Sequence, residues 1–283
     1  MRQIIHHALE RRLATSFPLA WVPNQATLVS IGILLALWLA LRQSRAIGLR
    51  PRTFALGLML ACAGAVVGAK AMGNLERVDL WWSQPSRLLD PNLGGATSFG
   101  ALLGGAAVLY LYLRRRHIDP WHVADTLAPL ALLGLAFARL GCFLQGCDYG
   151  RFSQVPWAVR FPRGTPAFAA QSDAGLLGPY QNLSLPLHPF QLYLVYFDLA
   201  LVLLFIAWPT LGRRRGSGRR AFLLAATYFS GRFALELARA PSAITTLGPL
   251  NLAQWLAIGT LLGLAILFYC HQRRACPAPP WGR

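Results

Sequence analysis

The chain has 283 residues, of which 55% are hydrophobic and 13% are charged, and its formal net charge is +17. Because soluble domains carry about 25% charged residues, this composition excludes a water-soluble fold and a disordered chain. Nor do we expect a nucleic-acid-binding protein, since a basic excess in so apolar a chain is typical of a membrane topology signal.

Seven apolar stretches run along the chain, each about the 20 residues that a helix needs to cross the hydrocarbon core of a membrane. They lie at residues 22–41, 53–72, 94–113, 124–143, 189–208, 221–237 and 250–270. The sequence therefore predicts an all-α polytopic membrane protein with seven transmembrane helices. Its residues 1–283 form a single integral-membrane domain in this interpretation.

Arginine is concentrated in alternate connections between these stretches. Four arginines separate the first stretch from the second, three separate the third from the fourth, and five separate the fifth from the sixth. Loops rich in arginine stay in the cytoplasm, so the N-terminus is predicted outside and the C-terminus in the cytoplasm. Residues 147–188 then form an extracytoplasmic loop, and residues 271–283 form a cytoplasmic tail.

Residues 1–21 lack the continuous apolar core of a cleavable signal peptide. Ile5, Leu9, Leu13 and Phe17 recur at helical spacing, and charged residues interrupt them. This pattern predicts an amphipathic helix that lies on the outer membrane surface.

Polar side chains inside apolar stretches are functional candidates, because a charge in mid-membrane costs at least about 2.5 kcal/mol. Arg232, Glu236 and Arg239 are spaced i, i+4 and i+7 and share one helix face. Under the predicted topology, these residues and several others project into the outer half of the bilayer: Arg139, His188, Gln191, Ser98 and Lys70. Several arginines in one chamber fit phosphate oxygens, since guanidinium binds them in a bidentate manner. A lipid phosphate is the expected anion.

Structural interpretations of the same residues remain open. The spacing of Arg232 and Glu236 equally fits a simple intrahelical ion pair. His188 before Pro189 equally fits the start of a helix, and Asp198 equally fits a bridge between two helices. Glycine pairs at four-residue spacing, 64/68, 100/104 and 259/263, predict helix contacts.

Cys142 and Cys147 match no metal-binding motif, and no metal is expected. If the helix continues through Phe143 and breaks only at Gly146, their side chains lie about 140° apart around the helix axis. We then expect free thiols rather than a disulfide.

Four segments carry motifs that occur together in one family. Residues 138–162 are similar to Arg-x-Gly-Asn-Phe-x-Asn-Gly-Glu followed by Gly-Arg and Pro-Trp-Ala-x-x-Phe-Pro. Residues 187–193 are similar to His-Pro-x-Gln-Leu-Tyr-Glu, residues 228–239 to Arg-x-x-x-Glu-x-x-Arg, and residues 94–104 to Ser-Phe-His-Gly-Gly. In order and spacing these segments resemble the prolipoprotein diacylglyceryl transferases of bacterial inner membranes.

The chain departs from the family motifs at several positions. Phe99, followed by Gly100, stands where the family has His before Gly-Gly, and Cys142 stands where the signature has its first Asn. The other replacements are Gln145 for the second Asn, Cys147 for the Glu after Gly, Leu194 for the Glu of the His-Pro motif and Lys70 for an Arg.

The resemblance implies an enzyme that moves the diacylglyceryl group of phosphatidylglycerol to the lipobox cysteine thiol of a secreted prolipoprotein, releasing glycerol phosphate. It also implies location in the bacterial inner (plasma) membrane. The expected partners are phosphatidylglycerol, prolipoprotein signal peptides and membrane lipids, without nucleic acid. No metal or organic cofactor is expected, and the protein is expected to be a monomer.

The resemblance also implies roles for individual residues. Arg139 and Arg232 hold the phosphate, Glu236 orients Arg232, and Arg151 and Arg239 lie near the outer mouth. The thiol loses its proton to His188 or through the positive field of the chamber. The remaining candidates for substrate binding are Gln191, Tyr193, Gly146, Gly150, Cys142 and Phe99.

Two other functions fit the sequence less well. One is a catalytically altered paralogue that binds lipid or lipoprotein without turnover. Phe99 and Cys142 suggest it, because they replace residues of the family motifs. The other is an unrelated seven-span receptor or transporter. The last stretch has no lysine for a retinal pigment, and the internal repeats of a transporter do not stand out.

Overall fold

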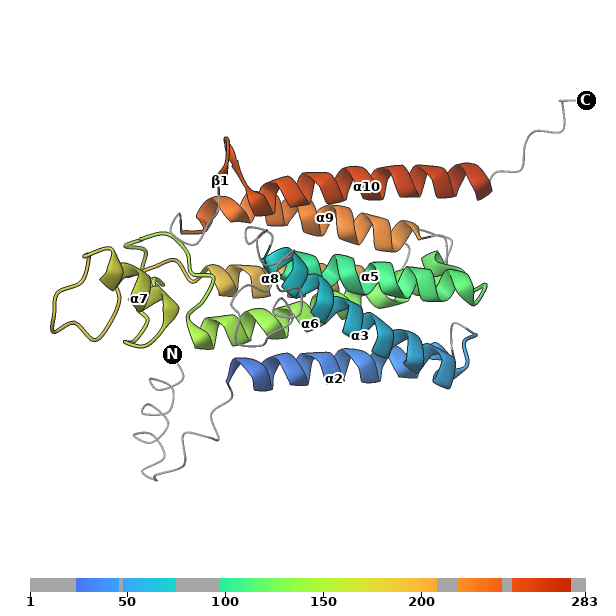
Figure 1. Cartoon of the computed structure of the whole chain (residues 1–283), viewed down its shortest axis with the longest axis horizontal. Helices are drawn as coiled ribbons and strands as arrows, with labels where there is room; N and C mark the ends of the chain where they lie inside the picture. The colour runs from blue at the N-terminus through green and yellow to red at the C-terminus, as the bar shows by residue number, and fades with distance from the viewer. Residues whose placement is uncertain (1–23, 46–47, 75–96, 208–217, 241–245, 276–283) are drawn as a thin grey trace, which may run out of the picture. The chain divides into compact units, whose positions relative to one another are not determined.

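The computed structural model describes residues 24–45, 48–74, 97–207, 218–240 and 246–275. The amphipathic helix predicted for residues 1–21 and most of the predicted tail lie outside the described residues. The described helices and strands, in chain order, are α2 (Gln25–Ser44), α3 (Pro51–Gly73), α5 (Ser98–Arg115), α6 (Pro120–Gln145), α7 (Pro166–Asp173), α8 (Phe190–Ala207), α9 (Arg219–Leu235), η3 (Glu236–Ala238), β1 (Thr246–Leu247), β2 (Leu250–Asn251) and α10 (Leu252–Ala275) (Figure 1).

Each of the seven apolar stretches corresponds to one long helix. Among the described residues, five helices are long and apolar enough to cross a membrane: α2, α3, α6, α8 and the Leu252–His271 part of α10. Helix α5 is less apolar because it ends in Arg114 and Arg115, and α9 has only 17 residues. The chain is therefore a polytopic α-helical membrane protein.

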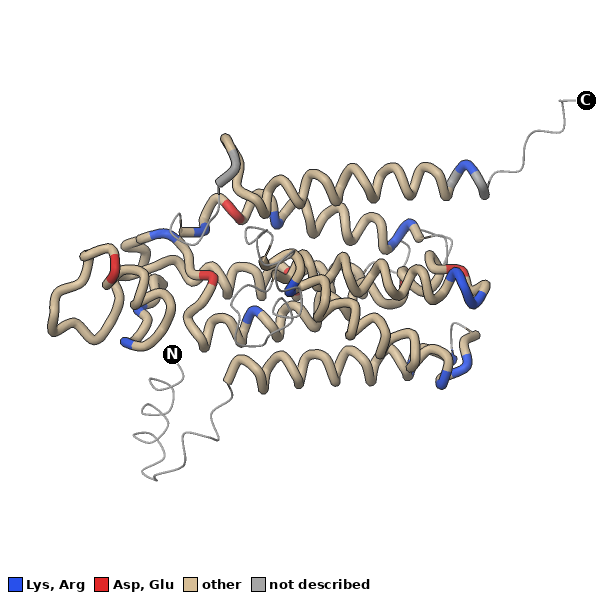
Figure 2. Tube along the Cα trace, viewed as in Figure 1, with Lys and Arg blue, Asp and Glu red and all other residues tan. Residues whose placement is uncertain are grey.

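The surfaces of these helices are apolar. Leu34, Met59, Leu203 and Ile266 are each more than 60% exposed, and long parts of the helices carry no charge (Figure 2). Exposed apolar surface on this scale is unfavourable in water, and it is what lipid chains would cover.

The chain divides into two compact units. One unit consists of residues 37–127 and 212–221. Its helices α3 and α5 touch backbone to backbone, because a Cβ atom on Gly100 would lie 2.1 Å from the carbonyl oxygen of Gly68. A Cβ atom on Gly104 would lie 2.4 Å from the carbonyl oxygen of Gly64. The glycine spacing in these two helices therefore marks a helix contact, as predicted.

The other unit consists of residues 1–36, 128–211 and 222–283. Within it, Gly32 of α2 faces the Phe137 side chain of α6. Helix α9 packs on α8 through the stacked rings of Tyr228 and Phe197, with centroids 6.3 Å apart. It also packs on α10, where the rings of Phe222 and Phe268 stack at 4.4 Å. In the described part of α10, Gly259 and Gly263 have nothing within 4 Å of a built Cβ, so the structure gives this pair no helix contact.

The segment predicted as a loop, 147–188, has a fold of its own. It contains α7, which begins with Pro166 and is capped by Thr165. Isolated bridges pair Phe152 and Val159 with Leu187. The segment covers a small core that also includes a residue following η3: Tyr149, Phe161, Ala167, Leu187 and Ala240. This core holds the segment against the end of α6, through Phe143, and against the residues that follow η3.

Candidate active site

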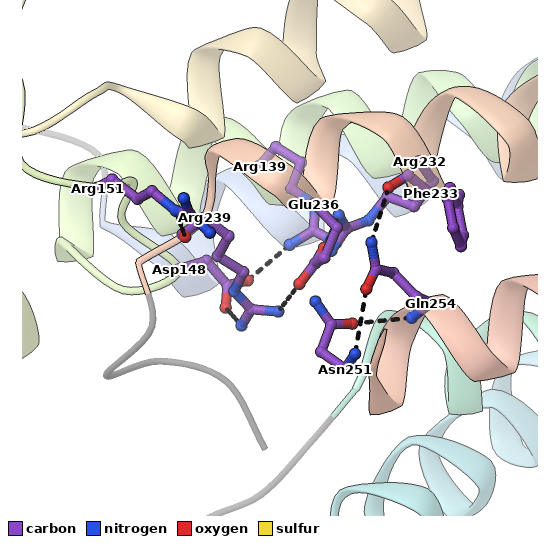
Figure 3. Close-up of polar contacts among 9 residues, drawn as sticks. All are labelled: Arg139, Asp148, Arg151, Arg232, Phe233, Glu236, Arg239, Asn251 and Gln254. Atoms are coloured by element: carbon purple, nitrogen blue, oxygen red, sulfur yellow. Dashed lines mark hydrogen bonds and ion pairs between the residues drawn. The ribbon is translucent and has the colours of Figure 1, made fainter. Parts of the chain in front are cut away.

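Five charged side chains of this second unit form one connected cluster (Figure 3). Arg139 lies near the end of α6, and Asp148 follows that helix. Arg232 lies in the last turn of α9, Glu236 begins η3, and Arg239 follows η3. The structure thus brings together four residues that the sequence places at the site, and adds Asp148.

Glu236 holds two of the arginines. Its Oε2 accepts a hydrogen bond from Nη1 of Arg232, and its Oε1 accepts one from Nη1 of Arg239 at 2.9 Å. Arg232 precedes Glu236 by four residues along the helix, as the sequence predicts. Arg239 does not share that helix face, because its backbone is extended beyond the end of η3, and it reaches Glu236 from outside the helix. Glu236 is 2% exposed and Arg232 is 4% exposed, so the pair is shielded from water.

Asp148 joins the third arginine to this group. Its Oδ2 accepts a hydrogen bond from Nη1 of Arg139 at 2.7 Å, and its Oδ1 accepts one from Nη2 of Arg239 at 2.5 Å. Burial raises the pKa of the Asp148 carboxyl, but the positive charges of Arg139, Arg239 and Arg232 outweigh burial and hold this pKa below its ordinary value. Asp148 is therefore ionised at neutral pH.

Positive charge exceeds negative charge at this place. Asp198 on α8 is 1% exposed and interacts electrostatically with Arg139 and Arg232. The five residues of the cluster are three arginines and two carboxylates, which leaves one positive charge. An ionised Asp198 would offset that charge, and the exposed Arg151, bonded to the Arg239 carbonyl, adds a positive charge at the edge. Among the described residues, the Nε atoms of Arg232 and Arg239 are buried donors without an acceptor. The arrangement therefore has both the charge and the free donors that an anion requires.

Two contacts fix the ends of the cluster. The guanidinium carbon of Arg232 lies 5.4 Å from the centroid of the Phe190 ring, a favourable cation–π distance. Beyond Arg232, Gln254 donates to the carbonyl of Phe233 at 3.5 Å. Gln254 and Asn251 cap the start of α10 reciprocally, with backbone-to-side-chain bonds of 2.9 and 3.1 Å.

A backbone pairing holds Arg239 in place. Gly150 forms an antiparallel bridge with Arg239, and a Cβ atom on Gly150 would lie 2.6 Å from the carbonyl oxygen of His188. Only glycine therefore fits at position 150, where the backbone runs between His188 and the segment of Ala238 and Arg239. The next residue, Arg151, is exposed and donates from Nε to the Arg239 carbonyl at 3.1 Å.

His188 forms a separate polar group with aromatic residues. Its Nδ1 lies 2.8 Å from the hydroxyl of Tyr193, and the same hydroxyl accepts a hydrogen bond from Nε1 of Trp157 at 2.8 Å. The backbone of His188 pairs with Gly150 and Arg151, which ties this group to the strand beside Arg239. The structure thus places His188 next to the cluster's backbone rather than in its ion-pair network.

The end of α6 and the start of α8 supply further residues that the sequence predicts at the site. The helix continues through Cys142 and ends at Gln145, and Gly146 has a φ of +79°. Cys142 and Cys147 are free thiols. A hydrogen bond with Cys142 and burial both raise the pKa of the Cys147 thiol, so this side chain is neutral at neutral pH. Gln191 is fully buried and donates to the carbonyl of Cys147 at 2.6 Å.

Phe99 lies in the other compact unit, buried near the start of α5. Hollows of about 490 and 390 Å³ lie along segment 147–188. The smaller hollow is lined by Tyr149, Arg151, Leu187 and Ala240 among others. It therefore adjoins the segment that pairs with Arg239.

Sequence reasoning missed the role of Asp148 and the contact between Trp157 and Tyr193. An acid two residues after a helix-ending glycine, nine residues beyond a buried arginine, was the available signal for Asp148. The partners of Trp157 depend on the fold of segment 147–188, which no local pattern reveals.

Comparison with known proteins gives one consistent result. Residues 16–270 match the family model described as prolipoprotein diacylglyceryl transferase. The chain is 32% identical over 188 residues to the phosphatidylglycerol–prolipoprotein diacylglyceryl transferase of Bordetella avium, which covers 66% of this chain and 64% of that protein. It is 32% identical to the enzyme of the same name from Idiomarina loihiensis, covering 76% of this chain and 74% of that protein. With the Bacillus cereus enzyme the identity is 30%, over 91% of this chain and 89% of the relative.

Proposed function

The chain belongs to the prolipoprotein diacylglyceryl transferase family, and from this premise we propose that it moves a diacylglyceryl group from phosphatidylglycerol to the lipobox cysteine thiol of a secreted prolipoprotein. In this reaction the thiol loses its proton and its sulfur forms a bond to the glyceryl carbon. The bond between that carbon and the phosphate oxygen breaks, and glycerol phosphate leaves. The attacking sulfur arrives with the substrate, so the enzyme needs no nucleophile of its own.

The arginine cluster supports this proposal more than any other feature. The reaction places negative charge on the departing phosphate, and fixed cations in a site shielded from water stabilise such charge well. Arg139 and Arg232 are 5% and 4% exposed, and the free Nε donor of Arg232 is available to a phosphate oxygen. We assign the phosphate to these two arginines, with Glu236 orienting Arg232 and with Arg151 and Arg239 at the mouth.

The remaining assignments follow the same proposal. Gln191 and Tyr193 contact substrate from the start of α8, and Cys142 lines the site at the end of α6. Gly146 and Gly150 shape the chain around it. His188, beside Tyr193, or the positive field of the arginines lowers the barrier to losing the thiol proton.

We also propose the topology and the location. The chain crosses the bacterial inner membrane seven times, with α5 and α9 as the two further spans. The N-terminus and segment 147–188 lie outside, and the C-terminus lies in the cytoplasm. The cluster then opens at the outer leaflet, where secreted precursors present their cysteine.

Phe99 and Cys142 support one alternative, because they replace residues of the family motifs. A catalytically altered member of the family would bind lipid through the same cluster without transferring it. In that case Phe99→His would restore transfer that the unmodified chain lacks.

Complementation of a bacterium depleted of its own transferase tests the proposal. We expect the chain to restore growth and to add one diacylglyceryl mass to a reporter lipoprotein. Arg139→Ala and Arg232→Ala should each abolish the mass increase while the protein remains in the membrane. Replacement by Lys should recover little, because an ammonium group cannot reproduce the bidentate fork.

Arg163→Ala is the matched control, because Arg163 is an exposed arginine of segment 147–188 that lies outside the cluster. This variant should lipidate the reporter fully. Full lipidation by either cluster variant would remove that arginine from the phosphate site. A wild-type chain that inserts but modifies nothing would contradict the transferase function itself.

A further inference from the structure

Asp148 occupies a position that the sequence motifs do not assign to an acid. It follows the turn at Gly146 and has a φ of +54°, in the left-handed region. This conformation costs most residues about 1–2 kcal/mol, but Asp is among the few that adopt it. The turn directs the carboxylate back towards Arg139, at the end of the helix that it has just left (Figure 3).

The carboxylate divides its two oxygens between two arginines. Oδ2 accepts from Arg139 and Oδ1 from Arg239, although 91 residues separate Asp148 from Arg239. A carboxylate that bridges two guanidinium groups fixes the distance and the angle between them, and it offsets their mutual repulsion. Asp148 thus links Arg139 on α6 to the two arginines that are paired with Glu236.

Position 147 explains why the carboxylate that bridges the two arginines is at position 148. The resembling motif carries its Glu at the position of Cys147, where this chain has a thiol. The Cys147 thiol is neutral and hydrogen-bonds with Cys142, so position 147 supplies no negative charge to Arg139. The adjacent residue supplies it instead.

We propose that Asp148 is a positioning residue of the transfer reaction, a carboxylate displaced by one residue that holds Arg139 at the substrate phosphate by tying it to Arg239 at the mouth of the site. This inference rests on the proposed function. It predicts that transfer requires a negative charge beside Arg139, whether residue 147 or residue 148 carries that charge.

The test uses the full-length chain purified in detergent, phosphatidylglycerol in mixed micelles and a lipobox peptide. Asp148→Asn removes the charge, keeps the shape and suits the left-handed conformation. We expect the KM for phosphatidylglycerol to rise about ten- to a hundredfold, the factor that a hydrogen bond to a charged group is worth. The double variant Cys147→Glu with Asp148→Asn returns the charge to position 147 and should recover most of the loss.

Asp173→Asn is the control, since Asp173 is an exposed acid at the end of α7, and its KM should equal the wild-type value. A purely structural role for Asp148 would reduce the amount of active enzyme, lowering kcat at unchanged KM, and that result overturns the proposal. A fall in KM overturns it too, because Asp148 would then compete with the phosphate. Failure of the double variant to recover any activity also overturns it. If the wild-type chain transfers nothing, the proposed function fails, and this role fails with it.

Discussion

At the scale of single residues, Glu236 is the carboxylate whose loss would leave the most buried charge of the site without a partner. It is almost fully buried and forms ion pairs with both Arg232 and Arg239. Breaking a buried ion pair by removing one partner costs about 3–5 kcal/mol, because the remaining charge stays buried without compensation. The stability of the protein and the order of its site therefore depend on the same carboxylate.

We expect Glu236→Gln to lower the thermal unfolding temperature of the detergent-solubilised protein and to reduce lipidation strongly. The reason is that glutamine removes the negative charge and keeps only one of the two oxygens that accept from Arg232 and Arg239. Unfolding monitored by circular dichroism and the mass of a reporter lipoprotein measure the two effects. Asp173→Asn, which removes an exposed carboxylate, should change neither. Wild-type stability in Glu236→Gln would mean that the arginines find other acceptors.

Single residues also show what a sequence can predict about this site. The contact of Arg232 with Glu236 follows from helical spacing, because four residues separate them. The same spacing predicts Arg239 on that helix face, which is wrong, because the backbone is extended at Arg239. The contact of Asp148 with Arg239 depends on a left-handed turn and on a pairing between distant strands. No local pattern encodes it.

At the scale of elements, the contact between α3 and α5 depends on the absence of side chains. Cβ atoms on Gly100 and Gly104 would meet backbone oxygens of α3 at 2.1 and 2.4 Å. Because backbone atoms cannot rotate away as side chains do, the two helices would have to separate.

Gly100→Ala and Gly104→Ala should each destabilise the protein by about 1–3 kcal/mol, the range for overpacking. Gly259→Ala is the matched control on α10, where nothing described lies within 4 Å of the new methyl group. It should leave the unfolding temperature unchanged or raise it, since Ala favours helix over Gly by about 1 kcal/mol. Equal effects of the three substitutions on thermal unfolding would refute the close contact.

The elements differ in how far the sequence predicts them. Long helices follow from apolar length, which is a local property, and all seven stretches have a corresponding helix. The fold of segment 147–188 does not follow, because its core combines Phe161 and Leu187 with Ala240, beyond the next two long helices. Such a core depends on contacts between segments that are distant in sequence.

At the scale of the whole molecule, the arginine distribution makes a prediction about sidedness. A reporter enzyme that works only outside the cytoplasm should be active when inserted after Tyr180, a residue 94% exposed on segment 147–188. It should be inactive when fused after Arg215 or at the C-terminus. The opposite pattern of activity would reverse the topology and move the cluster to the cytoplasmic leaflet.

The pairing of charges also bears on how the chain enters the membrane during synthesis. Arg139 is nine residues from Asp148, and Arg232 is four residues from Glu236. Each buried arginine therefore emerges from the ribosome close to its own counter-ion. An unpaired arginine would cost at least about 2.5 kcal/mol in mid-membrane, so we expect the local partner to let α6 enter the membrane before Arg239 has been made. The bridge from Asp148 to Arg239 closes only afterwards, once the sixth apolar stretch is in place.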